Sequence, residues 1–259
     1  MECLSMFILV TPTHYRNEKY CDLLVELVKH MWPHHPEIWF LTDTRGGQGI
    51  RYANKIKIES DQWVAVLLSG LKKLKNRYPG LEYIYLVLED LYPLWRCSDS
   101  DLIEIQKVAV KNQMGCVFFT TFDFNWELRV EVDGRSFYKI PADFPFYSQL
   151  QPAIWRLDHL IKTCEYALRT GIYNPWSFEH IIISNDHYVA DYRWPSVLNG
   201  FLERGHVNLE AVRTIRTDEG RRLKAALLRD YVLQLPAYAF RRLERKIINL
   251  PVQIRNLIN

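Results

Sequence analysis

The stretch that decides the fold is Tyr83-Ile84-Tyr85-Leu86-Val87-Leu88, an unbroken apolar run that leads directly into Glu89-Asp90. Continuous apolar runs of this length are typical of strands that are buried on both faces of a parallel sheet. We therefore predict a central strand with two carboxylates at its carboxyl end. Residues 61–77 before it have apolar positions at helical spacing, and Tyr78-Pro79-Gly80 ends that predicted helix.

The same alternation of strand and helix extends in both directions from this strand. Apolar runs predict strands, and apolar positions three to four residues apart predict helices. The further predicted elements are strands over 6–10, 37–43 and 117–120, helices over 17–31, 99–110, 156–170 and 176–184, and a hairpin around Asp133-Gly134. Such alternation predicts an α/β fold with βαβ units and a mostly parallel central sheet flanked by helices.

Length and composition limit the class of protein. The chain has 259 residues, of which 48% are hydrophobic and 24% charged, so it is globular rather than disordered. A net charge of +3 is too small to indicate a nucleic-acid partner. Five cysteines without a CxxC pair predict free thiols in a reducing compartment. Because no apolar stretch is long enough to cross a bilayer, we expect a cytoplasmic protein, or one peripheral on the inner face of the cytoplasmic membrane.

Charge divides the chain near residue 210. Residues 211–259 hold eleven Lys and Arg against four acids, whereas residues 1–210 carry a net charge of −4. Within this tail, apolar positions such as Phe240, Leu243 and Ile247 interleave with arginines. The pattern predicts a basic amphipathic helical segment that lies on an anionic membrane through 221–250. The alternative is that the segment docks against the rest of the protein or against a second copy of it.

Polar residues follow three of the predicted strands. Open sheets bind ligands at the carboxyl ends of their strands, where Thr11–Arg16, Asp43 and Glu89-Asp90 are expected. The hydroxyl, imidazole and guanidinium groups of Thr11, His14 and Arg16 suit the ribose and phosphates of a nucleotide, although they could equally cap the next helix. Asp90 can bind Mg²⁺ or Mn²⁺, which prefer oxygen ligands; the commoner role of such an acid is structural.

The second half of the chain offers a base and a sugar-binding surface. Glu179, in the first turn of the helix predicted from 176, could accept a proton from a hydroxyl, or could merely offset the helix dipole. Amide and aromatic side chains of the kind that bind sugars gather at Tyr147, Gln149, Gln151 and Trp155. The alternative for this stretch is a strand that buries Leu150, Ala153 and Trp155. No dinucleotide, Walker, zinc-protease or α/β-hydrolase motif is present.

Three stretches together carry a family resemblance. They are Leu88-Glu89-Asp90-Leu91-Tyr92, Leu150-Gln151-Pro152-Ala153-Ile154-Trp155-Arg156 and Asn174-Pro175-Trp176-Ser177-Phe178-Glu179. The chain resembles the bacterial glycosyltransferases of GT-A fold that build capsule, lipopolysaccharide O-antigen and related surface polysaccharides. The resemblance implies a GT-A-like, Rossmann-like catalytic domain over 1–210 and a basic helical appendage over 211–259. A homo-oligomer is compatible with it.

The resemblance also implies roles for individual residues. A nucleotide-sugar donor would lie against Thr11, His14, Arg16, Asp43, Trp63, Glu89 and Asp90. A saccharide or lipid-linked acceptor would lie against Tyr147, Gln149, Gln151, Trp155 and Trp176. Glu179 would be the base of an inverting transfer, and Asp90 would bind the divalent cation. Many members have Asp-x-Asp where this chain has Glu89-Asp90, so metal use stays open. The alternatives are a metal-dependent nucleotidyltransferase and a catalytically silent carbohydrate-binding scaffold.

Overall fold

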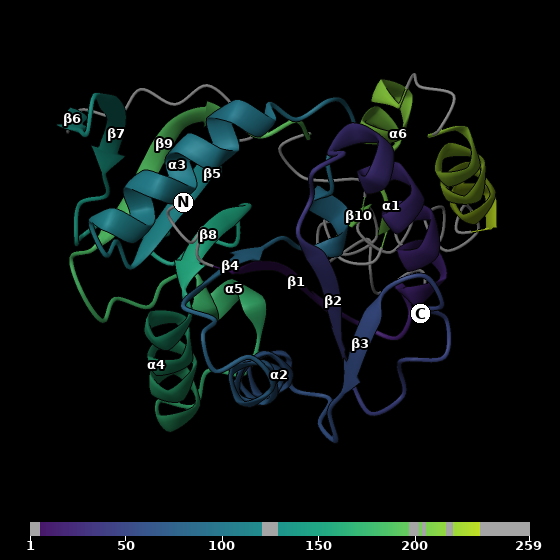
Figure 1. Cartoon of the computed structure of the whole chain (residues 1–259). Coiled ribbons are helices and arrows are strands. Elements are labelled where there is room, and N and C mark those ends of the chain that lie inside the picture. Colours follow the sequence, from purple (N-terminus) through teal and green to yellow (C-terminus); the bar gives the residue numbers. More distant parts are fainter. Residues whose placement is uncertain (1–5, 121–128, 197–201, 204–205, 216–219, 234–259) are drawn as a thin grey trace, which may run out of the picture.

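The computed structural model describes residues 6–120, 129–196, 202–203, 206–215 and 220–233 (Figure 1). Its centre is a sheet of nine strands in the order β3-β2-β1-β4-β8-β5-β9-β7-β6. The strands are β1 (Phe7–Thr13), β2 (Glu37–Thr42), β3 (Asn54–Lys57), β4 (Tyr83–Leu86), β5 (Cys116–Thr120), β6 (Arg129–Val132), β7 (Arg135–Lys139), β8 (Ala153–Arg156) and β9 (His187–Arg193). A separate short pair consists of β10 (Leu202–Glu203) and β11 (His206–Val207).

Helices cover both faces of this sheet. They are α1 (Glu18–Met31), α2 (Trp63–Arg77), α3 (Asp99–Lys111), α4 (Leu157–Arg169), α5 (Pro175–Phe178) and α6 (Leu209–Thr214), with a 3-10 turn, η1 (Glu89–Leu91). Figure 1 shows α1 and α3 on one side of the sheet and α2 and α4 on the other. Successive residues of β1 therefore enter different cores, Leu9 with α1 and α3, Ile8 and Val10 with α2 and α4.

The predicted α/β fold is confirmed, but the sheet is mixed rather than mostly parallel. Strands β3, β2, β1 and β4 run parallel to one another, as do β5 and β9. Strand β8 lies antiparallel between β4 and β5, and the β6–β7 hairpin continues the sheet antiparallel beyond β9. The hairpin turns at Asp133-Gly134, as predicted, with positive φ at both residues.

Two local predictions need correction. The helix predicted over 176–184 is only α5. After it, the Glu179 and Ile181 carbonyls accept hydrogen bonds from the Ser148 amide and hydroxyl instead of from a further helical turn. The stretch before residue 157 forms β8, so the alternative of a buried strand is confirmed there. Strand β3 was not predicted, because it has four residues and alternates exposed lysines with half-buried positions.

Part of the basic tail docks onto α1. Residues 221–233 are helical, and Leu223 and Leu227 enter the core cluster of α1 and α3. Asp230 accepts a hydrogen bond from the Tyr20 hydroxyl and forms an ion pair with Lys19. The described tail thus follows the docking alternative, whereas the stripe from Phe240 onward lies outside the described residues.

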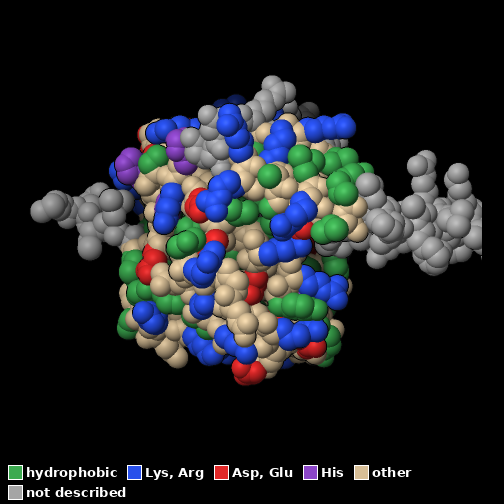
Figure 2. Space-filling view, turned by 90° about the vertical axis from the view of Figure 1, so that its right-hand side faces the viewer, with side chains coloured by type: hydrophobic (Ala, Val, Ile, Leu, Met, Phe, Trp, Pro, Cys, Tyr) green, Lys and Arg blue, Asp and Glu red, His purple; other side chains and the backbone are tan. Residues whose placement is uncertain are grey.

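Charges of both signs cover the surface next to this tail. Figure 2 shows Lys and Arg side chains spread across the face at the right of Figure 1, with Asp and Glu between them. Arg222 of the tail, for example, pairs with Glu26 at 2.8 Å. Within the described ranges no helix combines the length and the apolar character that a membrane span requires.

Candidate functional site

The candidate site lies where the chain leaves β1 and β4. From β1 the chain passes through α1 to β2, which lies on one side of the β1–β4 pair in the sheet. From β4 it passes through η1 and α3 to β5, which lies on the other side of that pair. Neighbouring parallel strands with diverging connections are the usual place of a ligand site in an open α/β sheet. The Val87 amide donates to the Val10 carbonyl at 3.1 Å, which keeps the two segments together past the end of β4.

The two acids after β4 have different surroundings. Both are half-buried, and Glu89 Oε1 accepts a hydrogen bond from Asn17 Nδ2 at 2.6 Å, across the two diverging connections. Asp90 Oδ1 is buried and has no hydrogen-bond partner among the described residues. Burial raises the pKa of Glu89, and burial together with the neighbouring Glu89 raises the pKa of Asp90. An unpartnered buried carboxylate oxygen is costly, so this position suits a proton, a cation or a ligand donor.

Thr11 does not face this site. Its hydroxyl lies 3.0 Å from the Tyr92 hydroxyl, and both side chains are fully buried in the core with α1. The prediction that Thr11 contacts a nucleotide therefore conflicts with its position. His14 and Arg16, in contrast, are exposed in the loop that follows β1.

Asp43 ties the loop after β1 to the loop after β2. Its carboxylate accepts hydrogen bonds from the Tyr15 amide at 3.1 Å and the Arg45 amide at 2.9 Å, and His14 Nε2 lies 3.7 Å away. Because the side chain is buried and already bonded, its observed role is to fix the two loops.

The tied loops present a group of basic side chains. The Arg45 guanidinium lies 4.0 Å from the centre of the Tyr15 ring, and Arg16 Nε donates to the Tyr15 hydroxyl at 3.0 Å. Sequence reasoning missed Tyr15 and Arg45, although each is adjacent to a residue that it singled out. Burial lowers the pKa of His14, so its imidazole is largely neutral at pH 7. The fixed positive charges are therefore those of Arg16 and Arg45.

Glu179 lies at the end of α5, not in its first turn. Asn174 caps that helix by accepting from the Ser177 amide at 2.9 Å, and Glu179 follows the last helical residue. Its Oε1 accepts from the Leu150 amide at 3.1 Å, and burial raises its pKa. Leu150 precedes β8, and Ala153 at the start of β8 pairs with Leu86 at the end of β4. Glu179 therefore lies at the same edge of the sheet as Asp90.

The structure divides the predicted sugar-binding residues into buried and accessible ones. Tyr147 and Trp155 are fully buried, so neither offers its face to a sugar. Gln149, Gln151 and Trp63 are half-buried, and Trp63 meets Phe178 edge-on at 5.6 Å. Trp176 is 59% exposed. Sequence reasoning missed the exposed rings of Phe146, next to the buried Tyr147, and Tyr173, just before α5.

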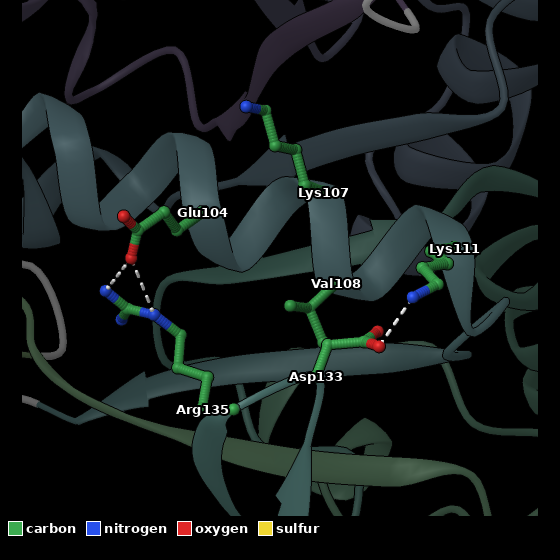
Figure 3. Close-up of a pocket in the computed structure, with 7 residues that line it drawn as sticks. Glu104, Lys107, Val108, Lys111, Asp133 and Arg135 are labelled. Carbon is green, nitrogen blue, oxygen red and sulfur yellow. Dashed lines mark hydrogen bonds and ion pairs between the residues drawn. The ribbon is translucent and has the colours of Figure 1, made fainter.

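A cavity of about 290 Å³ lies elsewhere, between α3 and the β6–β7 hairpin (Figure 3). Four of its charged lining residues form pairs, Arg135 with Glu104 at 2.7 Å and Lys111 with Asp133 at 2.6 Å, and Lys107 lines it as well. The Asp133-Gly134 turn lines it, but the candidate binding and catalytic residues do not.

The sheet edge at the end of β4 offers two carboxylates that could hold a metal ion. The described part of the chain holds no cluster of three or more His, Cys, Asp or Glu side chains that could bind an ion. Asp90, with its unpartnered oxygen, and Glu89 form an adjacent pair. Mg²⁺ is often held by one or two carboxylates together with the phosphates of a ligand, and this pair fits that arrangement.

Comparison with known proteins shows similarity at the level of fold. No protein-family model matches the chain, and no curated protein matches it in sequence. Among solved structures, 4-diphosphocytidyl-2C-methyl-D-erythritol synthase of Anaerococcus prevotii is 10% identical, over 73% of this chain and 90% of its own, with a TM-score of 0.43. Another structure of a synthase of that name is 10% identical over 81% and 99%, with a TM-score of 0.47. S. aureus TarS 1-349 is 13% identical over 96% and 76%, with a TM-score of 0.42.

Proposed function

We propose that this chain is a glycosyltransferase that moves a sugar from a nucleotide-sugar donor to a saccharide or lipid-linked acceptor. The observation that carries the proposal is the presence of two unlike carboxyl groups at one edge of the sheet. No described residue forms a hydrogen bond with the buried Oδ1 of Asp90, and Glu179 has a raised pKa and a fixed orientation. Pairs of carboxyl groups in different surroundings are suited to different roles in one reaction.

The donor lies on the side of the loops after β1 and β2. Arg16 and Arg45 supply fixed positive charge for its diphosphate, and Asp43 keeps their loops together. Asp90 and Glu89 would hold a Mg²⁺ or Mn²⁺ ion together with phosphate oxygens. When bound, such an ion would neutralise charge on the leaving diphosphate.

Glu179 is the base of an inverting transfer. Its carboxylate takes the proton of the acceptor hydroxyl as the hydroxyl oxygen bonds to the anomeric carbon and the diphosphate leaves. Burial raises the pKa of Glu179, which makes its carboxylate a stronger base than that of an exposed glutamate. The bond from the Leu150 amide leaves the other carboxylate oxygen, Oε2, for the acceptor.

The acceptor lies on the side of α5. Trp176 and Tyr173 offer exposed ring faces, and Gln149 and Gln151 offer amide groups close to Glu179. For a lipid-linked acceptor, the tail would place the protein on an anionic membrane. The exposed Leu228, Val232 and Leu233 on the docked helix support this placement.

The first test is thermal stabilisation by UDP-, GDP-, CMP- and dTDP-sugars, each with and without Mn²⁺. A ligand that binds only the native state raises the melting temperature, so a stabilising nucleotide sugar identifies the donor class. Stabilisation by nucleoside triphosphates with release of pyrophosphate would identify a nucleotidyltransferase instead. The absence of any nucleotide effect would favour the carbohydrate-binding scaffold.

The second test is Glu179→Gln. We expect donor-induced stabilisation to remain and turnover to fall by roughly 10²- to 10⁴-fold, because proton transfer to a side chain is lost. Glu165→Gln is the matched control, since Glu165 lies on α4 and pairs with Lys72 at 2.7 Å away from the site. Near-normal turnover of Glu179→Gln would reject Glu179 as the base.

A further inference from the structure

A chain of hydrogen bonds leads from the core to Glu179. The segment Tyr147–Leu150 holds this carboxylate from one side: the Leu150 amide donates to Glu179 Oε1 at 3.1 Å, and the Ser148 amide donates to the Glu179 carbonyl at 2.9 Å. The Ser148 hydroxyl donates to the Ile181 carbonyl at 2.7 Å. The segment is therefore joined to the backbone at the proposed base and two residues after it.

A buried pair of imidazoles contacts the same segment at Tyr147. His187 Nδ1 lies 2.9 Å from the Tyr147 carbonyl, and the Tyr147 ring stacks on the His187 ring at 4.3 Å. His187 Nε2 lies 2.8 Å from His159 Nε2. His187 is at the start of β9 and His159 is in α4, so the pair links two elements of the scaffold to the segment that holds Glu179.

The hydrogen bonds assign the proton positions in this pair. A carbonyl oxygen can only accept, so His187 Nδ1 must carry a proton. A neutral His187 then has a bare Nε2, which accepts from the Nε2 proton of His159. His159 thus fixes the tautomer of His187, and that tautomer is the one that can hold Tyr147.

We propose that His187 is a positioning residue for the Glu179 carboxylate and that His159 sets the tautomer of His187. This proposal rests on the proposed role of Glu179. His187 touches neither donor nor acceptor. It acts through the Tyr147 carbonyl, which fixes the backbone that presents the Ser148 and Leu150 amides to Glu179. Neither histidine has another role in the proposed reaction, and both are buried, where a polar group is stabilised by hydrogen bonds of this kind.

The test reads the bond from Leu150 to Glu179 directly. In protein labelled with ¹⁵N-Leu and ¹³C-carbonyl-Gln, only the Gln149–Leu150 and Gln234–Leu235 peptide groups give a coupled signal. The Leu150 amide proton should shift with pH as Glu179 ionises, and Glu179→Gln should abolish that shift. His187→Gln, whose amide reproduces Nε2 but not Nδ1, should also abolish it. His187→Asn, whose amide reproduces the Nδ1 donor, should keep it.

A second pair of variants tests the tautomer and replaces the first pair if His187→Gln does not fold. His159→Gln keeps a donor at the Nε2 position and should keep the Leu150 titration, whereas His159→Ala should reduce its amplitude at least twofold. Ile161→Val, a buried change on the same helix α4, controls for general destabilisation and should leave the titration intact.

The proposal fails if the Leu150 amide titrates in His187→Gln, or in His159→Ala, with the wild-type midpoint and amplitude. This readout needs no donor or acceptor, so a wild-type protein without transferase activity would reject the proposed function separately. In an active protein, His187→Gln should lower kcat with little change in the KM for the donor, and His187→Asn should restore kcat. A loss shared equally by both variants would indicate a purely structural histidine.

Discussion

At the scale of single residues, buried carboxylates in this protein differ in whether the fold supplies partners. Asp22 accepts hydrogen bonds from the Arg51 and Tyr52 amides and from Arg51 Nε, and these bonds outweigh burial and lower its pKa. Asp90 has a buried oxygen without such a bond, and its pKa is raised. Buried groups that lower the stability of the folded protein are commonly found at functional sites, so Asp90 is a strong candidate for a functional residue.

Asp90→Asn should therefore stabilise the folded protein at neutral pH. A carboxyl group whose pKa is raised on folding contributes stability below its unfolded pKa near 4, and this contribution is lost as pH rises through the folded value. The amide removes the buried charge beside Glu89, so we expect a gain of about 1–3 kcal/mol at pH 7.5, shrinking toward pH 4. Urea unfolding at both pH values measures it.

The same variant should lose nucleotide-sugar stabilisation, which separates a binding acid from a purely structural one. Asp158→Asn is the control, because Asp158 is exposed and pairs with Lys75 on the surface. We expect it to change stability by no more than about 0.5 kcal/mol. A destabilised Asp90→Asn protein at pH 7.5 would contradict the account of Asp90 as an unsatisfied acid.

Sequence reasoning found the acids more reliably than their neighbours. Glu89 and Asp90 stand out because they follow an apolar run, and Glu179 because it lies in the first turn of a predicted helix. Asn17 is 72 residues from Glu89 and Leu150 is 29 residues from Glu179, and no local pattern predicts these contacts. Tyr147 and Trp155 were assigned to a surface because an aromatic residue near a strand can face either way, and the packing of α4 and β9 decides the matter.

At the scale of elements, α1 holds the glycine loop after β2. The buried Glu18 carboxylate accepts from the Gly47 amide and, at 3.2 Å, from the Gly49 amide. A Cβ on Gly46 would lie 2.2 Å from Glu18 Oε1 and 2.9 Å from Thr42 Cβ. Gly46→Ala should therefore displace the loop and cost about 1–3 kcal/mol of unfolding free energy.

Gly80→Ala is the matched control for this prediction. A Cβ there meets no atom within 4 Å, and the backbone of Gly80 is outside the left-handed region. We expect its stability to equal or slightly exceed that of the wild type. If chemical denaturation shows equal stabilities for the Gly46 and Gly80 variants, Glu18 does not constrain the loop in the manner described.

The helix over 221–233 allows an equally close comparison between neighbouring leucines. Leu227 is fully buried against α1, whereas Leu228 is 40% exposed. Leu227→Ala should cost about 2–5 kcal/mol, and Leu228→Ala at most about 0.5 kcal/mol. Thermal or urea unfolding of the full chain distinguishes them. Equal losses would mean that this helix does not dock through Leu227 in solution.

Elements with a strong local pattern were predictable whatever their length: the four-residue β4 was predicted from its apolar run, whereas the seven-residue β9 was not predicted. The pattern of α2 fixes a buried face over four turns, so its position follows from the sequence. Strand β8 has four residues, and no pattern within it shows that it runs antiparallel to β4. The direction of a strand depends on the connection that leads to it, which here passes through the β6–β7 hairpin.

At the scale of the whole molecule, the buried imidazole pair couples global stability to pH. Burial lowers the pKa of His159 to about 4, with Arg156 and Lys162 acting in the same direction, and lowers that of His187 to about 3. The unfolded chain binds protons at both sites below about pH 6.5, and the folded chain does not. Stability from these groups is present above pH 6.5 and is lost as pH falls toward the folded values.

We therefore expect the double variant His159→Gln/His187→Asn to lose less stability than the wild type between pH 7 and pH 4.5. Each imidazole can account for up to about 2–3 kcal/mol over that interval. Acids with raised pKa values, such as Asp90 and Glu179, act in the opposite direction, but they are common to both proteins and cancel in the difference. If wild type and double variant lose stability in parallel, the pair is already accessible to protons, and it could not fix the segment that holds Glu179.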